Sequence, residues 1–275
     1  MKTRALCLAA LLPVCWLQVK AQSLRYPVSM PYIGLGAYSM KQTDVFAASG
    51  NKASLAAIES VTAGIYSERR FMLPQNSVYS LVLALPTAKG NFGIQVNHAG
   101  FKQYSETLAG LAYARKLGKK AMLGMQFNYY MHQVPSFGRA AVFNVELGAL
   151  LRFSEKLTGG VHIYNPVAGK LGKSRDEKLA SVYKAGLGFD ASTGFHIAIE
   201  CIKEEDKPVN LQAGVQYRFA KQFFVRAGFI GESDSVYGAA GVSWKNVYLY
   251  LATGYHPYLG FSPAMLLIAT LKRKR

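Results

Sequence analysis

The sequence predicts an all-β protein, a transmembrane antiparallel β-barrel of about 14 strands with a short N-terminal helical plug. Three observations predict this fold class. Apolar and polar residues alternate at period two from about residue 60 onward. Charged residues make up only 17% of the chain, against about 25% in an average globular protein. Short and longer connections alternate between these segments along the chain, as in outer-membrane barrels.

Residues 1–21 are predicted to form a secretory signal peptide. Lys2 and Arg4 give a basic start, residues 5–17 are apolar, and residues 19–21 form a small-x-small cleavage site. The apolar stretch is shorter than the ~20 residues needed to span a bilayer, so a membrane anchor is disfavoured. We therefore expect an exported protein that reaches the outer membrane of a Gram-negative cell.

Residues 22–59 differ in pattern from the rest of the chain and are predicted to form the plug. Thr43 and Asp44 are each suited to cap a short helix, and Gly50-Asn51 would end it before a further turn begins at Ala53. A mixed helical segment directly before a barrel is suited to fill its lumen. Residues 60–275 are then the barrel itself.

The predicted strands carry two different faces. In residues 122–132, for example, Leu123 and Phe127 lie on one face while Gln126 and Asn128 lie on the other. About 14 such segments follow one another, and many are ten residues or longer. Strands in globular sheets have about 5–6 residues, whereas a strand that crosses a bilayer at a tilt needs about 9–11.

A soluble β-sandwich or lipocalin-like barrel is the alternative to a membrane barrel, because period two reports two faces without saying which one meets lipid. Three features favour the membrane. Large apolar residues occupy one face along whole strands, the opposite faces are rich in Gly, Asn and Gln, and tyrosines gather near strand ends, as in an aromatic girdle.

If the apolar faces meet lipid, the polar faces point into the lumen. The candidate lumen lining is Gln126, Asn128, His132, Glu146, Arg152, Arg218 and Arg226. A charge away from water needs a partner, so Glu146 is expected to pair with one of these three arginines. The set predicts either a pore lining or ligand pocket, or ordinary contacts between barrel wall and plug, and the sequence leaves both open.

Catalytic and nucleic-acid functions find little support. The five histidines lie in separate segments, and no metal-ligand spacing, nucleophile elbow or phosphate loop occurs, so we expect no enzyme, no metal and no cofactor. Three of the +17 formal charges belong to the predicted signal peptide, and the remaining +14 is spread over turns, one long loop and the C-terminus, which argues against nucleic acid. Such cationic rims suit the phosphates of outer-membrane lipid, including lipopolysaccharide.

Two motifs resemble a known family. The first is carried by Gly34, Gly36, Asp44, Asn51, Ala53 and Leu55, with Lys52 where the motif has proline, and the second is His256-Pro257-Tyr258-Leu259-Gly260-Phe261-Ser262. The first is similar to the N-terminal signature of FadL-like outer-membrane barrels, including the PorV/PorQ group of type IX secretion systems. The second resembles an HPxLGxS element of the Bacteroidetes members.

This resemblance implies a 14-stranded barrel with both termini in the periplasm and an N-terminal hatch in the lumen. It implies either transport of hydrophobic compounds or a role as a type IX secretion component, with secretion components as possible partners. The longest loop, Pro166–Leu179, is short, so capture of large substrates by extended loops is not expected. The alternatives are a scaffolding barrel closed by its plug and, last, an outer-membrane enzyme.

Overall fold

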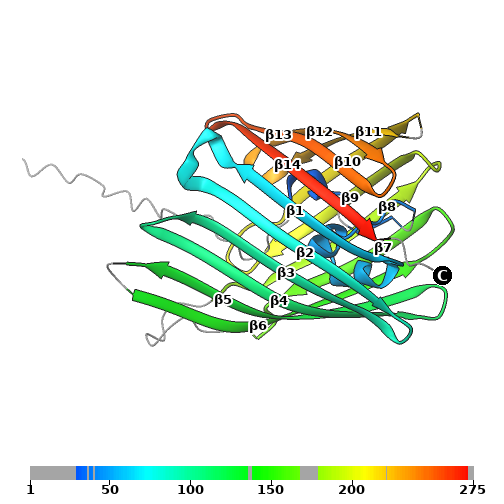
Figure 1. Cartoon of the computed structure of the whole chain (residues 1–275), viewed down its shortest axis with the longest axis horizontal. Coiled ribbons are helices and arrows are strands. Elements are labelled where there is room, and N and C mark those ends of the chain that lie inside the picture. The colour runs from blue at the N-terminus through cyan, green and yellow to red at the C-terminus, as the bar shows by residue number, and fades with distance from the viewer. Residues whose placement is uncertain are drawn as a thin grey trace, which may run out of the picture.

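The computed structural model of the chain contains one closed antiparallel barrel (Figure 1). Each strand pairs with its neighbours in sequence, and β1 pairs with β14, so the predicted fold class is confirmed. The structure describes residues 29–35, 37–39, 41–135, 138–167, 179–220 and 222–271. The predicted signal peptide, the start of the predicted plug and Gly36 lie outside these described residues.

Fourteen strands follow the plug in the described part of the chain. They are β1 Val61–Arg69, β2 Ser77–Thr87, β3 Gly90–Phe101, β4 Tyr104–Leu117, β5 Ala121–Val134, β6 Gly138–Arg152, β7 Leu157–Tyr164, β8 Val182–Asp190, β9 Phe195–Glu204, β10 Asn210–Phe219, β11 Phe223–Ile230, β12 Ser235–Trp244, β13 Val247–His256 and β14 Gly260–Leu271. The short helices are η1 Met30–Tyr32, α1 Ala47–Gly50, η2 Lys52–Ala57, η3 Arg70–Met72, η4 Pro74–Asn76 and η5 Gly231–Ser233.

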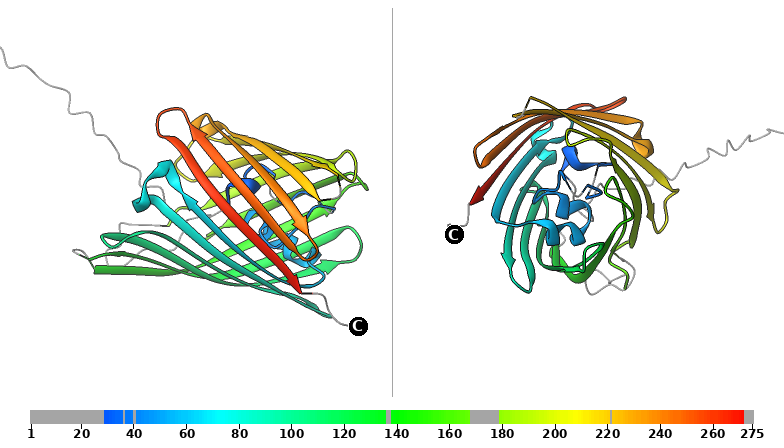
Figure 2. Two further views of the ribbon diagram at one scale, coloured as in Figure 1. Left: turned by 45° about the horizontal axis from the view of Figure 1, so that its top comes forward. Right: turned by 90° about the vertical axis from the view of Figure 1, so that its right-hand side faces the viewer.

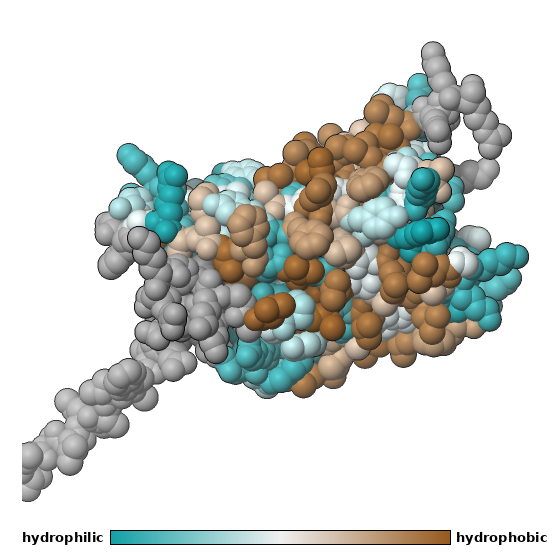
Figure 3. Space-filling view, turned by 90° about the horizontal axis from the view of Figure 1, so that it is seen from below, coloured by the Kyte–Doolittle hydropathy of each residue, from teal (hydrophilic) through white to brown (hydrophobic). Residues whose placement is uncertain are grey.

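The outer face of the barrel is apolar and the inner face is largely polar. Leu81, Phe127 and Leu211 point outward and are exposed, Phe127 to 57%, whereas Asn128 and Gln212 point inward and are buried. A band of hydrophobic residues crosses the outer surface, with hydrophilic residues at both ends (Figure 3). This is the arrangement expected of a barrel whose wall meets lipid.

The two ends of the barrel differ. At one, here called the turn end, β2–β3, β4–β5, β6–β7, β8–β9, β10–β11 and β12–β13 are joined by short turns, and β14 finishes. The other, the loop end, holds the remaining connections, of which the one between Tyr164 and Val182 is the longest. Neighbouring turns are tied together by backbone bonds, such as Arg152 N–H to the Lys120 carbonyl at 2.7 Å.

The plug runs through the lumen from the loop end to the turn end. Viewed along the barrel, the blue segment lies inside the ring of strands (Figure 2). Near the loop end, the Met30 N–H donates to the Tyr66 hydroxyl at 3.1 Å. Near the turn end, Asn91 Nδ2 donates to the carbonyls of Leu55 and Ile58, both at 2.7 Å.

The predicted helix cap needs a correction. The single α-helix of the plug, α1, has only four residues, and its N-cap is Phe46 rather than Thr43 or Asp44. Asp44 Oδ1 instead accepts the Phe46 N–H at 3.0 Å, which closes an Asx turn just before the helix. The other carboxylate oxygen of Asp44 is thereby left to face the barrel wall.

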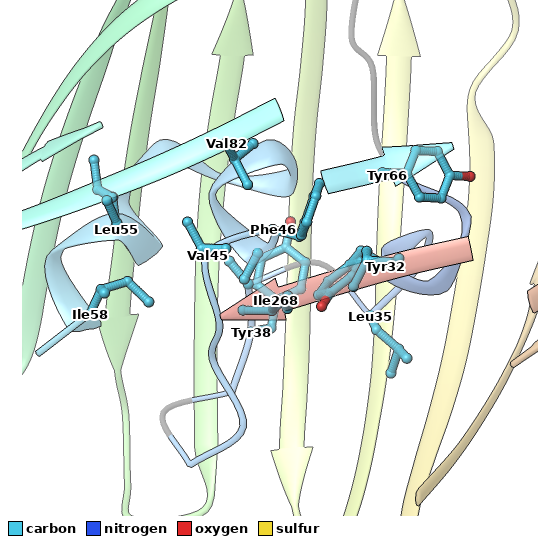
Figure 4. Close-up of a cluster of buried hydrophobic side chains, with 14 of the residues drawn as sticks. Tyr32, Leu35, Tyr38, Val45, Phe46, Leu55, Ile58, Tyr66, Val82 and Ile268 are labelled. Atoms are coloured by element: carbon cyan, nitrogen blue, oxygen red, sulfur yellow. The ribbon is translucent and has the colours of Figure 1, made fainter. Parts of the chain in front are cut away.

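Apolar contacts hold the plug against one side of the wall. Tyr32, Val45, Phe46 and Leu55 of the plug pack with Tyr66, Val82 and Ile268, which come from β1, β2 and β14 (Figure 4). Phe46 meets Tyr66 edge to face, with the ring centroids 6.3 Å apart. These strands include the seam where the barrel closes.

Candidate functional site: the plugged lumen

Asn51 fixes the position of η2 against the wall. It is the N-cap of η2, and its Oδ1 accepts the Ala53 N–H at 3.0 Å. Its Nδ2 donates to two wall carbonyls, Val161 at 3.0 Å and Ala149 at 3.3 Å. One side chain therefore caps the helix and joins it to β6 and β7.

Lys52, the first residue of η2, forms a buried ion pair with the wall. Its Nζ lies 3.2 Å from Glu146 Oε2 on β6, and the two side chains are only 3% and 5% exposed. It also donates to Gln95 Oε1 on β3 at 2.8 Å. Burial lowers the pKa of the Lys52 ammonium, and the Glu146 carboxylate opposes that shift.

The Glu146 carboxylate is surrounded by donors. His162 Nε2 lies 3.1 Å from Oε2, Asn128 Nδ2 donates to Oε1 at 2.7 Å, and Gln126 Nε2 donates to it at 3.3 Å. Asn128 is itself held by Asn144, at 2.8 Å. A buried carboxylate is tolerated when its lone pairs are satisfied in this way. We call Lys52, Gln95, Gln126, Asn128, Glu146 and His162 the β6 cluster.

A second charged contact has the opposite polarity, with the anion on the plug. Arg226 on β11 lies 3.7 Å from Asp44 Oδ2, and its guanidinium donates to the Pro31 carbonyl at 3.3 Å and the Tyr250 hydroxyl at 3.2 Å. It also stacks over the Tyr32 ring at 4.3 Å. Burial raises the pKa of Asp44, and Arg226 opposes that shift.

The middle of the plug is bound to β8 and β9. The Tyr38 hydroxyl donates to Glu200 Oε1 at 2.7 Å, and Lys184 lies 3.9 Å from the other oxygen of the same carboxylate. The Ser39 hydroxyl donates to Asp190 Oδ1 at 2.8 Å. Separate contacts to β6, to β8 and β9, and to β11 therefore hold the plug against the wall.

Inward-facing glycines let the plug approach the wall closely. A Cβ added to Gly124 on β5 would lie 2.4 Å from the carbonyl carbon of Lys52, and one added to Gly148 on β6 would lie 2.2 Å from Asn51 Oδ1. Within the plug, Gly34 has φ +70° and rests on the Ala213 backbone. The glycine content of the polar faces thus has a steric reason.

The predicted lining residues fall into two groups. Gln126, Asn128, Glu146 and Arg226 are buried inside the barrel and contact one another or the plug. His132 is half-buried towards the loop end, near the Tyr104 ring. Arg152 and Arg218 lie at the turn end, where Arg152 Nε donates to the Ser154 carbonyl at 3.3 Å.

The expectation that an arginine neutralises Glu146 is wrong. Lys52 and His162 pair with it, and Arg226 pairs instead with Asp44. Lys52 was not among the functional residues predicted from the sequence. The available signal was a lysine within a run of small residues, at the position where the family motif has proline. Of the other signature residues, Ala53 and Leu55 are buried in the plug core.

Near the loop end, the lumen contains a second cluster of buried apolar side chains, which was not predicted from the sequence. Its buried, inward-facing residues are Val78, Leu108, Tyr130, Tyr164, Leu179, Val182 and Ile202. They come from β2, β4, β5, β7, β8 and β9 and the loop between β7 and β8, and we call them the loop-side cluster. Tyr164 also accepts from Asn144 at 3.1 Å, and Asn144 accepts from Asn128, so Asn144 connects this cluster to the β6 cluster.

Two further properties bear on the kinds of site present. In the described part of the chain, no helix is long and apolar enough to cross a membrane. Within the same residues, no group of three or more His, Cys, Asp or Glu side chains is placed to hold a metal ion.

These features define the molecule as a transmembrane-type β-barrel of 14 strands whose lumen holds its own N-terminal segment. Solved structures share this fold. The CymD monoaromatic hydrocarbon channel has a TM-score of 0.60 and 13% identity, covering 88% of this chain and 94% of its own. The Ralstonia pickettii toluene transporter TbuX has a TM-score of 0.61 and 9% identity, covering 83% and 94%.

A Pseudomonas aeruginosa FadL homologue is similar as well, with a TM-score of 0.56, 11% identity and coverage of 85% and 94%. No family model and no curated protein matches the sequence. Likeness at these identities shows a common fold, and at that level the FadL-like resemblance of the N-terminal motif agrees with the structure.

Proposed function

We propose that this protein is an outer-membrane channel for small hydrophobic compounds, held closed in this structure by its plug. The observation that carries the proposal is the loop-side cluster, a group of buried apolar side chains inside the lumen that is separate from the apolar contacts of the plug. Similar barrels include a monoaromatic hydrocarbon channel and a toluene transporter, which supports this substrate class. The short loops favour small compounds over large ones.

In the proposed mechanism, the compound enters from the loop end and moves out of water into contact with the loop-side cluster. This transfer is favourable for apolar solutes. The plug blocks further passage at the level of η2. Displacing η2 separates Lys52 from Glu146, but the carboxylate keeps His162, Asn128 and Gln126 as partners. These wall donors still satisfy the oxygens of the carboxylate, and water that follows η2 out of the lumen can hydrate its charge, so opening costs less than removing the ammonium while the lumen stays closed.

The test is uptake of a labelled monoaromatic hydrocarbon by a Gram-negative host that expresses the full chain. Replacing Leu108 and Ile202 by Asn makes the loop-side cluster polar and is expected to abolish the added uptake. Gel mobility of the folded barrel checks that the variant still assembles. Uptake no faster than in the host without this chain would contradict the proposal.

Planar-bilayer conductance separates a plugged channel from a scaffolding barrel. The full chain is compared with a chain lacking residues 22–57, which removes the plug through η2 but keeps the barrel strands. Conductance that appears only after the deletion supports a plugged channel. Absence of conductance in both forms supports the scaffolding role. Fractionation of the cell envelope tests the outer-membrane location.

A role in type IX secretion, as in the PorV/PorQ group of Bacteroidetes, rests on the sequence resemblance. Part of that resemblance has a local structural explanation, since His256 Nδ1 accepts the N–H groups of Tyr258 and Leu259 at 3.2 and 3.3 Å and so closes the β13–β14 turn. Recovery of secretion components with the protein from native outer membranes would favour this role. We propose no catalytic activity.

A further inference from the structure

The exposed charges of the barrel are distributed unequally between its two ends. Within three residues of the turn-end connections, the described chain has nine exposed or half-exposed cations and two exposed acids, Glu59 and Glu155. The cations are Lys89, Arg115, Lys116, Lys119, Lys120, Arg152, Lys156, Arg218 and Lys245. No described carboxylate forms an ion pair with any of them.

The loop end is closer to neutral by the same count. The described residues there provide six exposed or half-exposed cations, Arg69, Arg70, Lys102, Arg139, Lys203 and Lys207, and four exposed acids, Glu205, Asp206, Glu232 and Asp234. Two of these cations are paired, Arg70 with Glu68 at 3.4 Å and Lys207 with Glu204 at 2.9 Å. Among the described residues, the net exposed charge is therefore +7 (9 − 2) at the turn end and +2 (6 − 4) at the loop end.

The turn-end cations lie at the edge of the apolar band, beside aromatic rings. Arg115 follows Leu111 and Tyr113 on the outer face of β4, and the Tyr113 hydroxyl donates to the Lys89 carbonyl at 2.9 Å. Lys245 Nζ is 5.6 Å from the centre of the exposed Trp244 ring. Rings with cations just beyond them are typical of the depth at which lipid headgroups lie.

Six of these cations come from one sector, formed by the β4–β5 and β6–β7 turns. They are Arg115, Lys116, Lys119, Lys120, Arg152 and Lys156, and Glu155 is the one acid among the described residues of these turns. The Arg152 N–H to Lys120 carbonyl bond joins the two turns at 2.7 Å. The two turns that carry the cations of this basic sector are therefore held side by side at the turn end.

We propose that this basic sector binds the headgroups of anionic phospholipids in the periplasmic leaflet. The short turns of outer-membrane barrels face the periplasm, which places the sector beside that leaflet. A lipid fits better than a soluble anion, because Arg115 projects from the lipid-facing side and the aromatic neighbours point outward. The sequence-based expectation of lipopolysaccharide contacts concerned the rims in general, whereas the excess of cations among the described residues lies at the turn end.

The experiment compares the full chain in phosphatidylcholine vesicles with and without phosphatidylglycerol. One variant replaces Arg115, Lys119, Lys120 and Lys156 by Gln. A matched control replaces the same number of exposed loop-end cations, Arg69, Lys102, Arg139 and Lys203, by Gln. The readouts are the temperature at which the barrel loses its folded gel mobility and the apparent affinity for phosphatidylglycerol in detergent by native mass spectrometry.

We expect phosphatidylglycerol to raise the unfolding temperature of the natural chain and of the loop-end control. In the turn-end variant this shift is lost and the affinity falls by about tenfold or more, since each cation near an anionic surface adds to the attraction. High salt is expected to reduce the shift in the natural chain. Equal behaviour of the two variants, or no preference for phosphatidylglycerol in the natural chain, would overturn the proposal.

The inference depends on the barrel spanning a membrane and is independent of the transported compound. Folded mobility in plain phosphatidylcholine vesicles reports insertion separately. A chain that inserts but shows no lipid preference contradicts only the headgroup site, whereas a chain that fails to insert contradicts the membrane assignment itself.

Discussion

The lumen and the loop rim each contain a lysine paired with glutamate, at similar distances but in different surroundings. Lys52 and Glu146 are 3.2 Å apart, with both side chains almost fully buried. At the rim, Lys207 lies 2.9 Å from Glu204 and 3.1 Å from Glu232, and its side chain is 27% exposed. The rim pair has the shorter distance, yet water screens it on one side.

The comparison shows that the distance between the charges does not by itself decide how much each pair contributes to stability. Removing one partner of a buried pair leaves a charge without water or a counter-ion, whereas a rim charge is hydrated again. The lumen pair therefore governs whether the plug stays in place, and the rim pair mainly joins two loops. Four substitutions test this ranking.

The largest effect is expected for Lys52→Met. It leaves the Glu146 carboxylate buried without its ammonium partner and should lower the free energy of unfolding by about 3–5 kcal/mol. The measurement is the urea midpoint of the barrel in detergent micelles. The double variant Lys52→Met/Glu146→Gln removes both charges and should recover part of the loss. A single variant as stable as the natural chain would show that the pair does not hold the plug.

Gly124→Ala tests the same interface without changing any charge. The added methyl group would lie 2.4 Å from the Lys52 carbonyl carbon, so plug or wall must shift, at a cost of about 1–3 kcal/mol. Gly238→Ala is the matched control, because open space surrounds a Cβ at that position. Equal urea midpoints for the two variants would remove the steric argument for the wall glycines.

Asp44→Asn removes the oxygen that accepts from the Tyr32 and Tyr250 hydroxyls and is expected to cost less, about 1–2 kcal/mol. Asp44 is 20% exposed at its side chain, and Arg226 keeps Gln216, Tyr250 and the Pro31 carbonyl as partners. Limited proteolysis of the plug, followed by mass spectrometry, gives a direct measure of its release. If the plug is released as extensively as in Lys52→Met, the two ion pairs hold the plug equally strongly, which would contradict the ranking.

The same variant should change the pH dependence. Because the pKa of Asp44 is raised in the folded protein, its stabilising contribution is present at acid pH and is lost as the pH rises through that folded pKa. Asp44→Asn is expected to lack this part of the slope above about pH 4. Urea midpoints for both proteins across the acid range provide the comparison.

The smallest effect is expected for Lys207→Met at the loop rim, less than about 1 kcal/mol. Lys207 and Glu232 are 27% and 39% exposed at their side chains, so water reaches the pair when the cation is lost, although Glu204 itself is only 7% exposed. The urea midpoint should barely change, and added salt should reduce the difference further. A loss comparable to that of Lys52→Met would reverse the ranking of lumen and rim.

The barrel was predictable from sequence because each strand records its two faces in neighbouring residues. Gln126 and Asn128 could be assigned to the lumen from the alternation in that strand alone. The partner of Glu146 could not be assigned in the same way, because it comes from the plug, 94 residues earlier, and the pairing depends on how η2 lies in the lumen. Only the departure from proline at Lys52 marked the position.

The loop-side cluster was missed for a related reason. Val78, Leu108 and Ile202 lie near strand ends, where the alternation gives way to loop sequence, and inward-facing apolar residues look like local irregularities. They become a group only when six strands and a loop bring them together in space. The wall and the presence of a plug were thus predictable from the sequence, whereas contacts between distant segments depend on the fold.

The close fit between plug and wall glycines makes the plug sensitive to strand register. A slip of one residue in β5 or β6 would turn Gly124 or Gly148 towards lipid and place a side chain where η2 lies. Bonds such as Tyr38 to Glu200 join residues 162 positions apart and require the intervening strands to be aligned. The plug therefore fits the lumen only when the strands are paired in the correct register, and a barrel paired out of register would have an open lumen.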